Sequence, residues 1–338
     1  MIKLSIPEHL IDKVKSIPEK PGVYKMKDSR GNIIYIGKSK CLNKRVKSYF
    51  QFNPKSNKIK TMIFNIHDID FVVTDTHLEA QLLECELIKK LKPIYNTQFK
   101  NDKKYVYLKV ENYNKSNALS VTLDRENEHS FGPYRSRNLL LKFVDLLKNL
   151  YPLKRYGDLY NFNYSPLLIN MKKEDFEENR QCLLQILSQT KYMNNFMLII
   201  KEKMKEASSS LQFERASYYK DILMALEYLY NLNKNNILKD RKILVGDKID
   251  DGYKLFYISD GNLVFKRKFY NLTAKNVNKF LSEVKSLKNN IDCPKSEKNN
   301  LDFKLIINNE LRTNPLISTL FINESCNLKL FVNNLQKI

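Results

Sequence analysis

Two tyrosines lie in short apolar runs on either side of a turn-forming stretch. Tyr24 falls in PGVYKM and Tyr35 in NIIYIG, and the intervening KDSRGN favours a turn. A turn centred between Ser29 and Arg30 would put Tyr24 directly opposite Tyr35, on one face of a two-stranded ribbon. Two facing phenols form an aromatic packing pair unless charged neighbours give them a chemical role. Charged neighbours follow at once in the sequence.

A basic segment without any acidic residue begins three positions after Tyr35. It carries aromatic side chains among eight basic residues, which are Lys38, Lys40, Lys44, Arg45, Lys47, Lys55, Lys58 and Lys60. A solvated helix face normally carries both signs of charge, so this pattern indicates contact with phosphates. Ser39 is expected to cap a helix that carries Arg45.

A carboxylate within an apolar helical stripe is the third chemical feature. Glu84 shares one helix face with Ala80, Leu87, Ile88 and Leu91. Burying an unpaired carboxylate costs several kcal/mol, so Glu84 requires a basic partner or a cation. One carboxylate beside phenols and basic groups suits a single hard cation with mostly water ligands, Mg²⁺ or Mn²⁺. Two other acids of this segment lie off the stripe and are expected on the surface, namely Glu79 and Glu86.

The composition limits the class of protein. The 338 residues include 58 Lys and Arg against 37 Asp and Glu, and the formal net charge of +21 favours a polyanionic partner. The hydrophobic fraction of 43% excludes a wholly disordered chain, and no apolar run is long enough to span a membrane. Neither the five cysteines nor the four histidines show metal-ligand spacing. We therefore expect a cytoplasmic protein with free thiols, no membrane partner, and histidines on the surface or in packing roles.

The order and spacing of these pieces resemble a known nuclease domain. PGVY…YIGK, an arginine seven residues after that lysine, and EAQLLE…KPIYN are similar to the GIY-YIG domain. The similarity is specifically to the N-terminal nuclease of the UvrC type, which acts in bacterial nucleotide-excision repair, and it runs from Pro21 to Lys104. It implies a phosphodiester hydrolase that cuts double-stranded DNA, with damaged DNA as the expected substrate.

The resemblance implies a role for each matching residue. Lys38 and Arg45 match the basic pair that holds the scissile phosphate and stabilises its charge. Glu84 matches the metal ligand, and Asn96 matches an asparagine near the phosphate. The neighbouring lysines are expected to grip the DNA backbone, and these are Lys40, Lys44, Lys47, Lys58 and Lys60.

The resemblance also implies that a tyrosine, together with the metal, activates the attacking water. Tyr24 and Tyr35 are both candidates for this base, and Tyr35 is preferred. A free phenol has a pKa of about 10 and is a poor base at neutral pH. Lys38, Arg45 or the metal therefore has to lower it.

The resemblance continues beyond the nuclease. FGPYRS at 131–136 is similar to a segment of UvrC-type chains, and MKEASSSLQFERASYYKDILMALEYL resembles the UVR motif, a pair of short helices. This motif implies binding to a UvrB-type protein through residues 195–232, with Leu211 and Phe213 as apolar anchors. UvrC-type chains carry four cysteines for an iron–sulfur cluster in the connecting region. This chain has only Cys182 there, so no cluster is expected.

The last part of the chain matches UvrC-type chains only loosely. Two apolar runs flank Asp260-Gly261, which predicts a hairpin. Further expectations are a polar linker over 233–250, a helix over 276–284, and strands at 303–307, 317–322 and 328–332. The second nuclease and the helix-hairpin-helix domain of UvrC-type chains are expected to be absent, so the chain resembles the short homologue Cho.

The predicted fold class is α+β. We expect a GIY-YIG domain with a small antiparallel sheet and flanking helices over 1–100, a connecting region without iron–sulfur cysteines over 101–194, a UVR-like helical hairpin over 195–232, and an α/β segment over 245–338. The expected function is metal-dependent nicking of one strand, 3′ of a lesion, in concert with a UvrB-type protein. The alternatives are a non-catalytic adaptor that binds DNA and UvrB, and a GIY-YIG nuclease outside repair.

Overall fold

The computed structural model describes residues 6–51, 56–100, 105–167, 170–234, 238, 241–287, 297–323 and 326–338. The chain divides into two compact units. The first unit combines residues 1–102 with 237–338, and the middle unit consists of residues 103–236. Lys55 of the basic segment lies outside the described residues. No helix within the described ranges is both long and apolar enough to cross a membrane.

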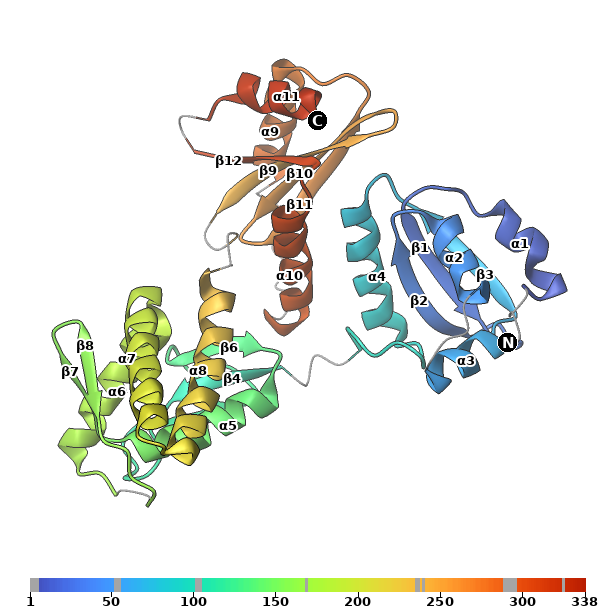
Figure 1. The fold of residues 1–338 in the computed structure, drawn as a ribbon. Coiled ribbons are helices and arrows are strands. Elements are labelled where there is room, and N and C mark those ends of the chain that lie inside the picture. The colour runs from blue at the N-terminus through green and yellow to red at the C-terminus, as the bar shows by residue number, and fades with distance from the viewer. Residues whose placement is uncertain are drawn as a thin grey trace. The chain divides into compact units, whose positions relative to one another are not determined.

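A three-stranded antiparallel sheet forms the centre of the N-terminal part of the first unit (Figure 1). Its order is β2-β1-β3, with β1 at Gly22–Lys27, β2 at Ile33–Ser39 and β3 at Asp68–Val73. The helices are η1 Glu8–Leu10, α1 Ile11–Ser16, α2 Leu42–Gln51, α3 Asn57–Phe64 and α4 His77–Leu91. A small antiparallel sheet with flanking helices confirms the predicted fold class.

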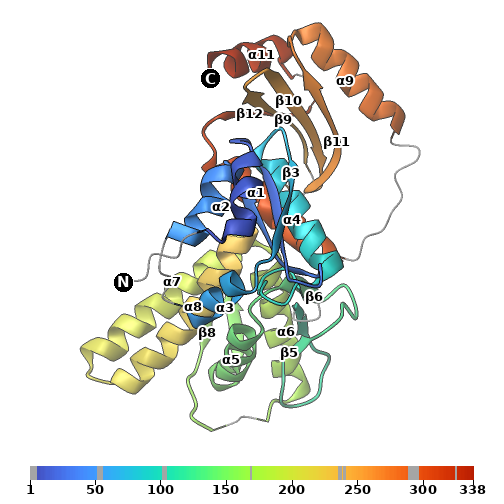
Figure 2. The same ribbon diagram turned by 90° about the vertical axis from the view of Figure 1, so that its right-hand side faces the viewer.

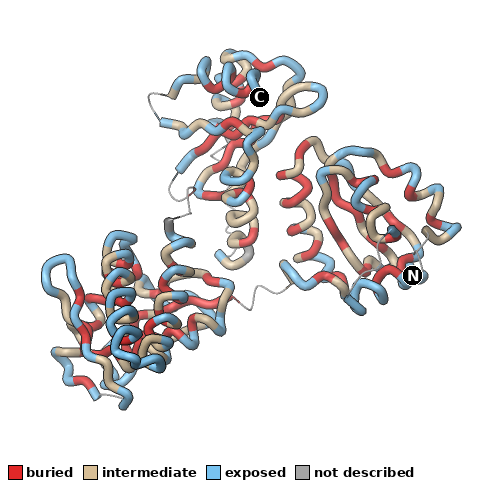
Figure 3. The backbone as a smooth tube through the Cα atoms, viewed as in Figure 1, coloured by how far each residue is buried: buried red, intermediate tan, exposed pale blue. Residues whose placement is uncertain are grey.

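The two faces of this sheet pack against different helices, because successive strand residues point to opposite sides. Val23 and Ile36 pack against residues of α4 such as Ala80. Tyr24 and Met26 belong to the larger cluster that includes side chains of α1, α2 and α3. Figure 3 shows buried residues along β1 and β2. The sheet is therefore fixed from both sides.

The β1–β2 hairpin has a different register from the predicted one. Tyr24 pairs with Gly37 rather than with Tyr35. The loop is wider than predicted because the Asp28 carboxylate accepts two backbone N–H groups, at 2.9 and 2.8 Å, and an irregularity after Met26 shifts the pairing further. The total shift is two residues, which preserves the side-chain face. Both tyrosines consequently lie on one face, as predicted, but diagonally.

Gly37 lies directly under the ring of Tyr24. A Cβ atom at this position would stand 2.3 Å from the Tyr24 hydroxyl and 2.4 Å from its Cζ. We expect Gly37→Ala to displace the ring and to lower the free energy of unfolding by about 1–3 kcal/mol, the usual range for overpacking. Urea unfolding measures the change. An unchanged midpoint would mean that the ring does not rest on Gly37.

The C-terminal part of the first unit contains a four-stranded antiparallel sheet in the order β11-β10-β9-β12. The strands are β9 Lys242–Ile249, β10 Gly252–Ser259, β11 Asn262–Phe269 and β12 Ile317–Phe321, and the helices are α9 Ala274–Leu287, α10 Glu297–Thr313 and α11 Leu328–Lys337. The predicted hairpin is present, with Asp260 and Gly261 at φ values of 50° and 77°.

Three predictions for this part were wrong. Residues 303–307 and 328–332 lie in α10 and α11 rather than in strands, and β9 occupies part of the predicted linker over 233–250. A short apolar run has the same appearance in a buried helix as in a strand. The overlooked signal for α11 is Asn327, whose side chain accepts the Leu330 N–H at the start of that helix.

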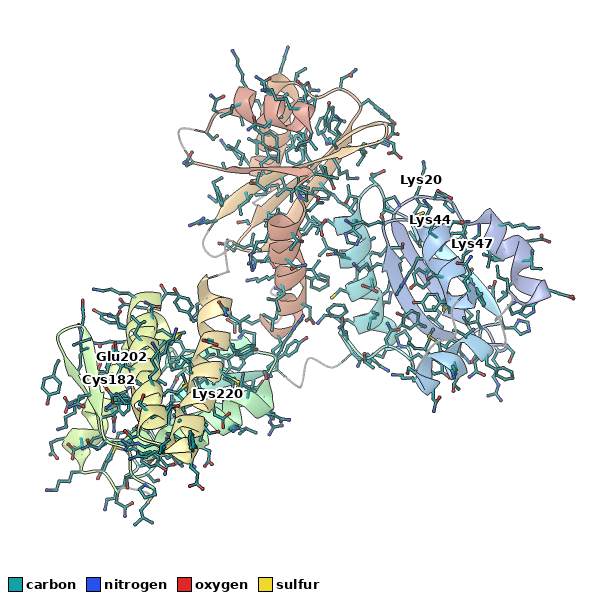
Figure 4. The ribbon with its side chains drawn as sticks, in the orientation of Figure 1. Lys20, Lys44, Lys47, Cys182, Glu202 and Lys220 are labelled. Atoms are coloured by element: carbon teal, nitrogen blue, oxygen red, sulfur yellow. The ribbon has the colours of Figure 1, made fainter. Side chains whose placement is uncertain are left out.

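The middle unit combines small sheets with a group of helices. The strands are β4 Val106–Val110, β5 Leu119–Thr122, β6 Ser130–Tyr134, β7 Leu153–Tyr156 and β8 Leu159–Phe162. The helices are α5 Arg137–Leu147, η3 Lys148–Leu150, α6 Lys173–Ser188, α7 Thr190–Ser209 and α8 Phe213–Lys234. Cys182, labelled in Figure 4, is buried in α6, and burial raises the pKa of its thiol to about 11.

Helices α7 and α8 form an antiparallel hairpin, drawn in yellow at the lower left of Figure 2. The connection is short because Leu211 adopts a positive φ of 57° and the Gln212 N–H donates to the Ala207 carbonyl. Leu211 is 73% exposed and Phe213 is 63% exposed. Two large apolar side chains thus face solvent at the tip of the hairpin.

Candidate active site

Three tyrosines meet on one face of the N-terminal sheet. Tyr24 comes from β1, Tyr35 from β2 and Tyr49 from α2, and their ring centroids are 6.0 to 6.2 Å apart. The hydroxyls of Tyr24 and Tyr49 are hydrogen-bonded at 2.7 Å. Tyr24 is almost fully buried, whereas Tyr35 is only partly covered. Of the two predicted candidates for a base, Tyr35 is therefore the more accessible.

Burial and mutual repulsion raise the pKa of two of these phenols. Burial raises the pKa of both Tyr24 and Tyr35, and the neighbouring Tyr49 raises it further. The charge of Arg45 acts in the opposite direction without reversing the result. Lys38, Arg45 or the metal was expected to lower the pKa of the base. Without a cation, desolvation outweighs the charge of Arg45, so the metal is the remaining candidate for this effect.

Arg45 is on α2 one helical turn before Tyr49. Its guanidinium carbon is 5.2 Å from the Tyr49 ring centroid, a cation–π distance. The helix begins at Leu42, so Ser39 does not cap it directly; instead the Ser39 hydroxyl bonds the backbone of Cys41 in the preceding turn. The stacked arginine remains exposed and keeps donors for an anion.

Glu84 meets β2 through the backbone of Lys38. The Lys38 N–H donates to Glu84 Oε1 at 3.0 Å. Burial raises the pKa of Glu84, while this hydrogen bond and the charges of Lys38 and Arg45 act to lower it. The negative charge of Glu84 in turn raises the pKa of Tyr35. These four predicted residues therefore interact at one place.

The donor set fits a single hard cation with few protein ligands. Within the described ranges, no hydrogen bond reaches the second carboxylate oxygen of Glu84, and no cluster of three or more His, Cys, Asp or Glu side chains has metal-site geometry. A half-buried carboxylate with one open oxygen matches Mg²⁺, which keeps several of its waters and accepts one or two carboxylates. Burial raises the pKa of Glu84 because it disfavours the charged carboxylate, and a bound cation would stabilise that charge and lower the pKa.

Asn96 is predicted to lie near the phosphate, and the structure gives its amide a backbone partner. Its Oδ1 accepts the Ile36 N–H at 2.9 Å, and its Nδ2 donates to the Ile36 carbonyl at 2.8 Å. Asn96 is 8% exposed. The side chain thus continues the ladder at the open edge of β2 and fixes the strand that carries Tyr35 and Lys38.

The predicted DNA-binding lysines are exposed or partly exposed. Lys44 and Lys47, labelled in Figure 4, belong to α2, and Lys58 and Lys60 belong to α3. Lys44 has an exposed ion pair with Glu19 at 3.7 Å, which contributes little. In the part of the chain that the structure describes, Lys40, Lys47, Lys58 and Lys60 have no carboxylate within 4.0 Å. These lysines are available to phosphates.

Comparison with known proteins identifies two segments of the chain that match described families. A model of the UvrC-like GIY-YIG domain matches residues 20–97, and a model of the UvrB/uvrC motif matches residues 200–229. The chain carries a UvrC-like GIY-YIG domain and a UVR motif. UvrABC system protein C of Acetivibrio thermocellus is 31% identical over 280 residues, and that of Clostridium novyi is 33% identical over 279 residues.

The similarity covers only part of these relatives. Both alignments include 76% of this chain but 44% of the relative, so the chain spans less than half the length of the curated proteins it matches. A solved GIY-YIG N-terminal endonuclease domain of UvrC from Thermotoga maritima, bound to magnesium, is 38% identical. That match covers 27% of this chain and all of the solved chain, with a TM-score of 0.25.

Two residues of the GIY-YIG domain site were not predicted. Tyr49 could have been found because it lies four residues after Arg45 on a helix. His77 was expected on the surface or in packing, but its Nε2 lies 2.9 Å from Lys38 Nζ. No sequence signal identifies His77, because the contact depends on how β2 meets the first turn of α4.

One acid of the GIY-YIG domain was wrongly expected on the surface. Glu79 is 6% exposed and completes a capping box with Thr76 at the start of α4. It also forms ion pairs with Lys254 at 3.2 Å and Lys266 at 2.7 Å, both from the C-terminal sheet. Helical periodicity cannot reveal partners that arrive from residues far along the chain.

Proposed function

We propose that this chain is a metal-dependent DNA endonuclease of nucleotide-excision repair. The observation that carries the proposal is the meeting of an accessible phenol, a stacked guanidinium and a half-buried carboxylate with one open oxygen, contributed by Tyr35, Arg45 and Glu84. Among the described residues, Lys40 and Lys47 have no carboxylate within 4.0 Å, and both lie close in the chain to Lys38 and Arg45. Such a set suits attack of water on a phosphodiester, in which negative charge builds up on phosphorus-bound oxygens.

Each side chain has a chemical task in this proposal. Arg45 donates to the scissile phosphate and stabilises the added charge. Lys38 contributes a second positive charge, and its ammonium has three donors, of which His77 uses one. Tyr35 would accept the proton of the attacking water in its phenolate form, which the bound cation would favour. Tyr24 and Tyr49 hold that phenol in place, and Asn96 fixes its strand.

Glu84 would hold Mg²⁺ or Mn²⁺ through its open oxygen, and the bound cation would lower the pKa of the water and of the nearby phenol. The cation is needed for this step because the pKa of Tyr35 is raised in the protein alone, where the phenol is protonated at neutral pH. Glu84 itself is fixed by the Lys38 N–H, so its open oxygen keeps one direction relative to Tyr35.

The test is an incision assay with the full chain on a lesion-bearing duplex, with Mg²⁺ and with or without a UvrB-type protein. We expect one nick on the 3′ side of the lesion that depends on the cation. Binding of DNA without any cut under every condition would instead favour a non-catalytic adaptor. Efficient cutting of undamaged DNA that ignores the UvrB-type protein would favour a GIY-YIG nuclease outside repair.

The UVR hairpin is proposed to dock on a UvrB-type protein through its tip. Leu211→Asn and Phe213→Ala are each expected to weaken binding about tenfold or more, because exposed apolar anchors account for most of the affinity of a small interface. Asparagine tolerates the positive φ of residue 211, so the loop is preserved. Titration calorimetry with the partner measures the loss.

The matched control for the hairpin is Leu198→Ala on α7, where the side chain is 52% exposed but away from the tip. Its affinity is expected to remain within twofold of the original, by rough estimate. Equal losses at Leu198 and at the two tip residues would contradict docking through the tip.

A further inference from the structure

The side chain of Lys38 is held by a residue pair that joins α4 to the C-terminal part of the first unit. Its Nζ lies 2.9 Å from His77 Nε2, and His77 Nδ1 lies 3.4 Å from Glu310 Oε2. His77 is the first residue of α4, and Glu310 belongs to α10, which lies beside α4 in Figures 1 and 2. A carboxylate, an imidazole and an ammonium thus follow one another.

The protonation of the imidazole follows from its neighbours. An ammonium group can only donate, so His77 Nε2 has to accept, and the ring proton of the neutral imidazole resides on Nδ1. There it faces the Glu310 carboxylate, which is a hydrogen-bond acceptor. Gln81 Nε2 lies 3.1 Å from His77 Nδ1 and 3.4 Å from His77 Nε2, and it donates to Glu310 Oε2 at 3.1 Å. An amide nitrogen can only donate, so with the ring proton on Nδ1 the Gln81 amide donates to Glu310 and not to Nδ1.

The surroundings of Glu310 favour an ionised carboxylate that is held in one orientation by hydrogen bonds. Its side chain is 5% exposed and the His77 side chain is 14% exposed, so little water competes. Asn314 Nδ2 donates to Glu310 Oε1 at 2.9 Å, and Gln81 donates to Oε2. Burial pushes the pKa of Glu310 upward, but the hydrogen bonds from His77 and Asn314 outweigh it and leave the pKa below its ordinary value.

We propose that His77, oriented by Glu310, is a positioning residue for Lys38, so that α10 of the C-terminal segment supports the phosphate-binding lysine. This inference rests on the proposed function, in which Lys38 touches the phosphate. It assigns the C-terminal segment a part in the site: the segment supplies the carboxylate that selects the imidazole tautomer. One ammonium donor is held by His77, and the other two are directed towards the phosphate.

Two substitutions of His77 distinguish the loss of the hydrogen-bond acceptor for Lys38 from the mere loss of the imidazole ring. The amide oxygen of Gln reaches the place of Nε2, so His77→Gln retains an acceptor for Lys38. That of Asn reaches only the place of Nδ1, so His77→Asn does not. Asp302→Asn is the matched control, because Asp302 also lies on α10 and is also buried, but its ion pair is with Lys89 at 2.8 Å.

The first readout does not depend on nuclease activity. The full chain is pulse-labelled with acetic anhydride, and the acetylation of Lys38 relative to Lys47 is measured by peptide mass. Loss of one hydrogen bond to the ammonium is expected to speed labelling of Lys38 about two- to tenfold in His77→Asn. Glu310→Gln is expected to speed the labelling of Lys38 by a smaller factor. His77→Gln and Asp302→Asn are expected to be labelled at Lys38 as fast as the original chain.

The second readout is the nicking rate, where His77→Asn is expected to lower kcat about fivefold or more while KM for DNA stays within about twofold, with recovery in His77→Gln. Unchanged Lys38 labelling in His77→Asn would overturn the positioning role, whatever the nicking result. Equal labelling changes in Asp302→Asn would overturn it as well, since general loosening of α10 would then suffice. If the variants show the expected changes in Lys38 labelling but the original chain never nicks DNA, the proposed function is refuted and the positioning of Lys38 by His77 is retained.

Discussion

Glu84→Gln is expected to lower Mg²⁺-dependent nicking by about a thousandfold, because it removes the carboxylate charge that would hold the cation near Tyr35. The amide oxygen can still accept the Lys38 N–H, so the contact between α4 and β2 is preserved. The assay is single-turnover cleavage of a lesion-bearing duplex at saturating protein.

The same variant has an expected effect on stability that an inactive but misfolded protein would not show. Because burial raises the folded-state pKa of Glu84, the folded state binds the proton more tightly than the unfolded state does. Ionised Glu84 therefore reduces stability as pH rises from the unfolded pKa through the folded one. Without metal, Glu84→Gln is expected to be at least as stable as the original chain at neutral pH.

Magnesium should reverse that order, since a bound cation offsets the buried charge. We expect Mg²⁺ to raise the Tm of the original chain and to leave that of Glu84→Gln unchanged. Glu86→Gln, two residues along the same helix and exposed, is the matched control with unchanged nicking and an unchanged response to Mg²⁺. Nicking that survives Glu84→Gln would exclude Glu84 as the metal ligand.

Tyr35→Phe is expected to reduce nicking about 10²- to 10⁴-fold, the usual contribution of a general base. The substitution removes one oxygen and leaves the ring in contact with Tyr24 and Tyr49. The pKa of Tyr35 is raised in the protein, so the fraction of phenolate grows with pH across the neutral range. The rate is therefore expected to increase with pH from about 6 to about 9 and to lose most of this dependence in Tyr35→Phe.

Tyr24→Phe is the informative comparison for Tyr35. Tyr24 is nearly inaccessible and its hydroxyl bonds Tyr49, so its loss is expected to cost about 1 kcal/mol of stability and about tenfold in rate. A larger loss of rate in Tyr24→Phe than in Tyr35→Phe, with the pH dependence lost only in the former, would reassign the base to Tyr24.

Most of the candidate site could be predicted from the sequence because those residues are close together in the chain. Tyr35, Lys38 and Arg45 lie within one strand and the following helix, and the apolar stripe around Glu84 marked it as an unusual carboxylate. Alternation along β1 and β2 also put both tyrosines on one face. Residues that are linked by strand or helix periodicity can be predicted from it.

The features that the sequence missed depend on contacts over long separations or on turn details. The hairpin register depended on how the Asp28 carboxylate shapes the loop. Glu79 is buried by lysines from the C-terminal sheet, and His77 meets Glu310 of α10. The helices at 303–307 and 328–332 were mistaken for strands because a short buried apolar run has no distinctive period.

The most direct test of a hydrolytic centre is incision in water enriched in ¹⁸O, with Mg²⁺, a lesion-bearing duplex and a UvrB-type protein. If Tyr35 activates water and Arg45 stabilises the phosphate, one product strand carries a single ¹⁸O in its terminal phosphate, and no strand is attached to the protein. Mass spectrometry of the two product strands reads both outcomes. Intact DNA under these conditions, or a covalent adduct between a strand and the chain, would contradict hydrolysis at this site.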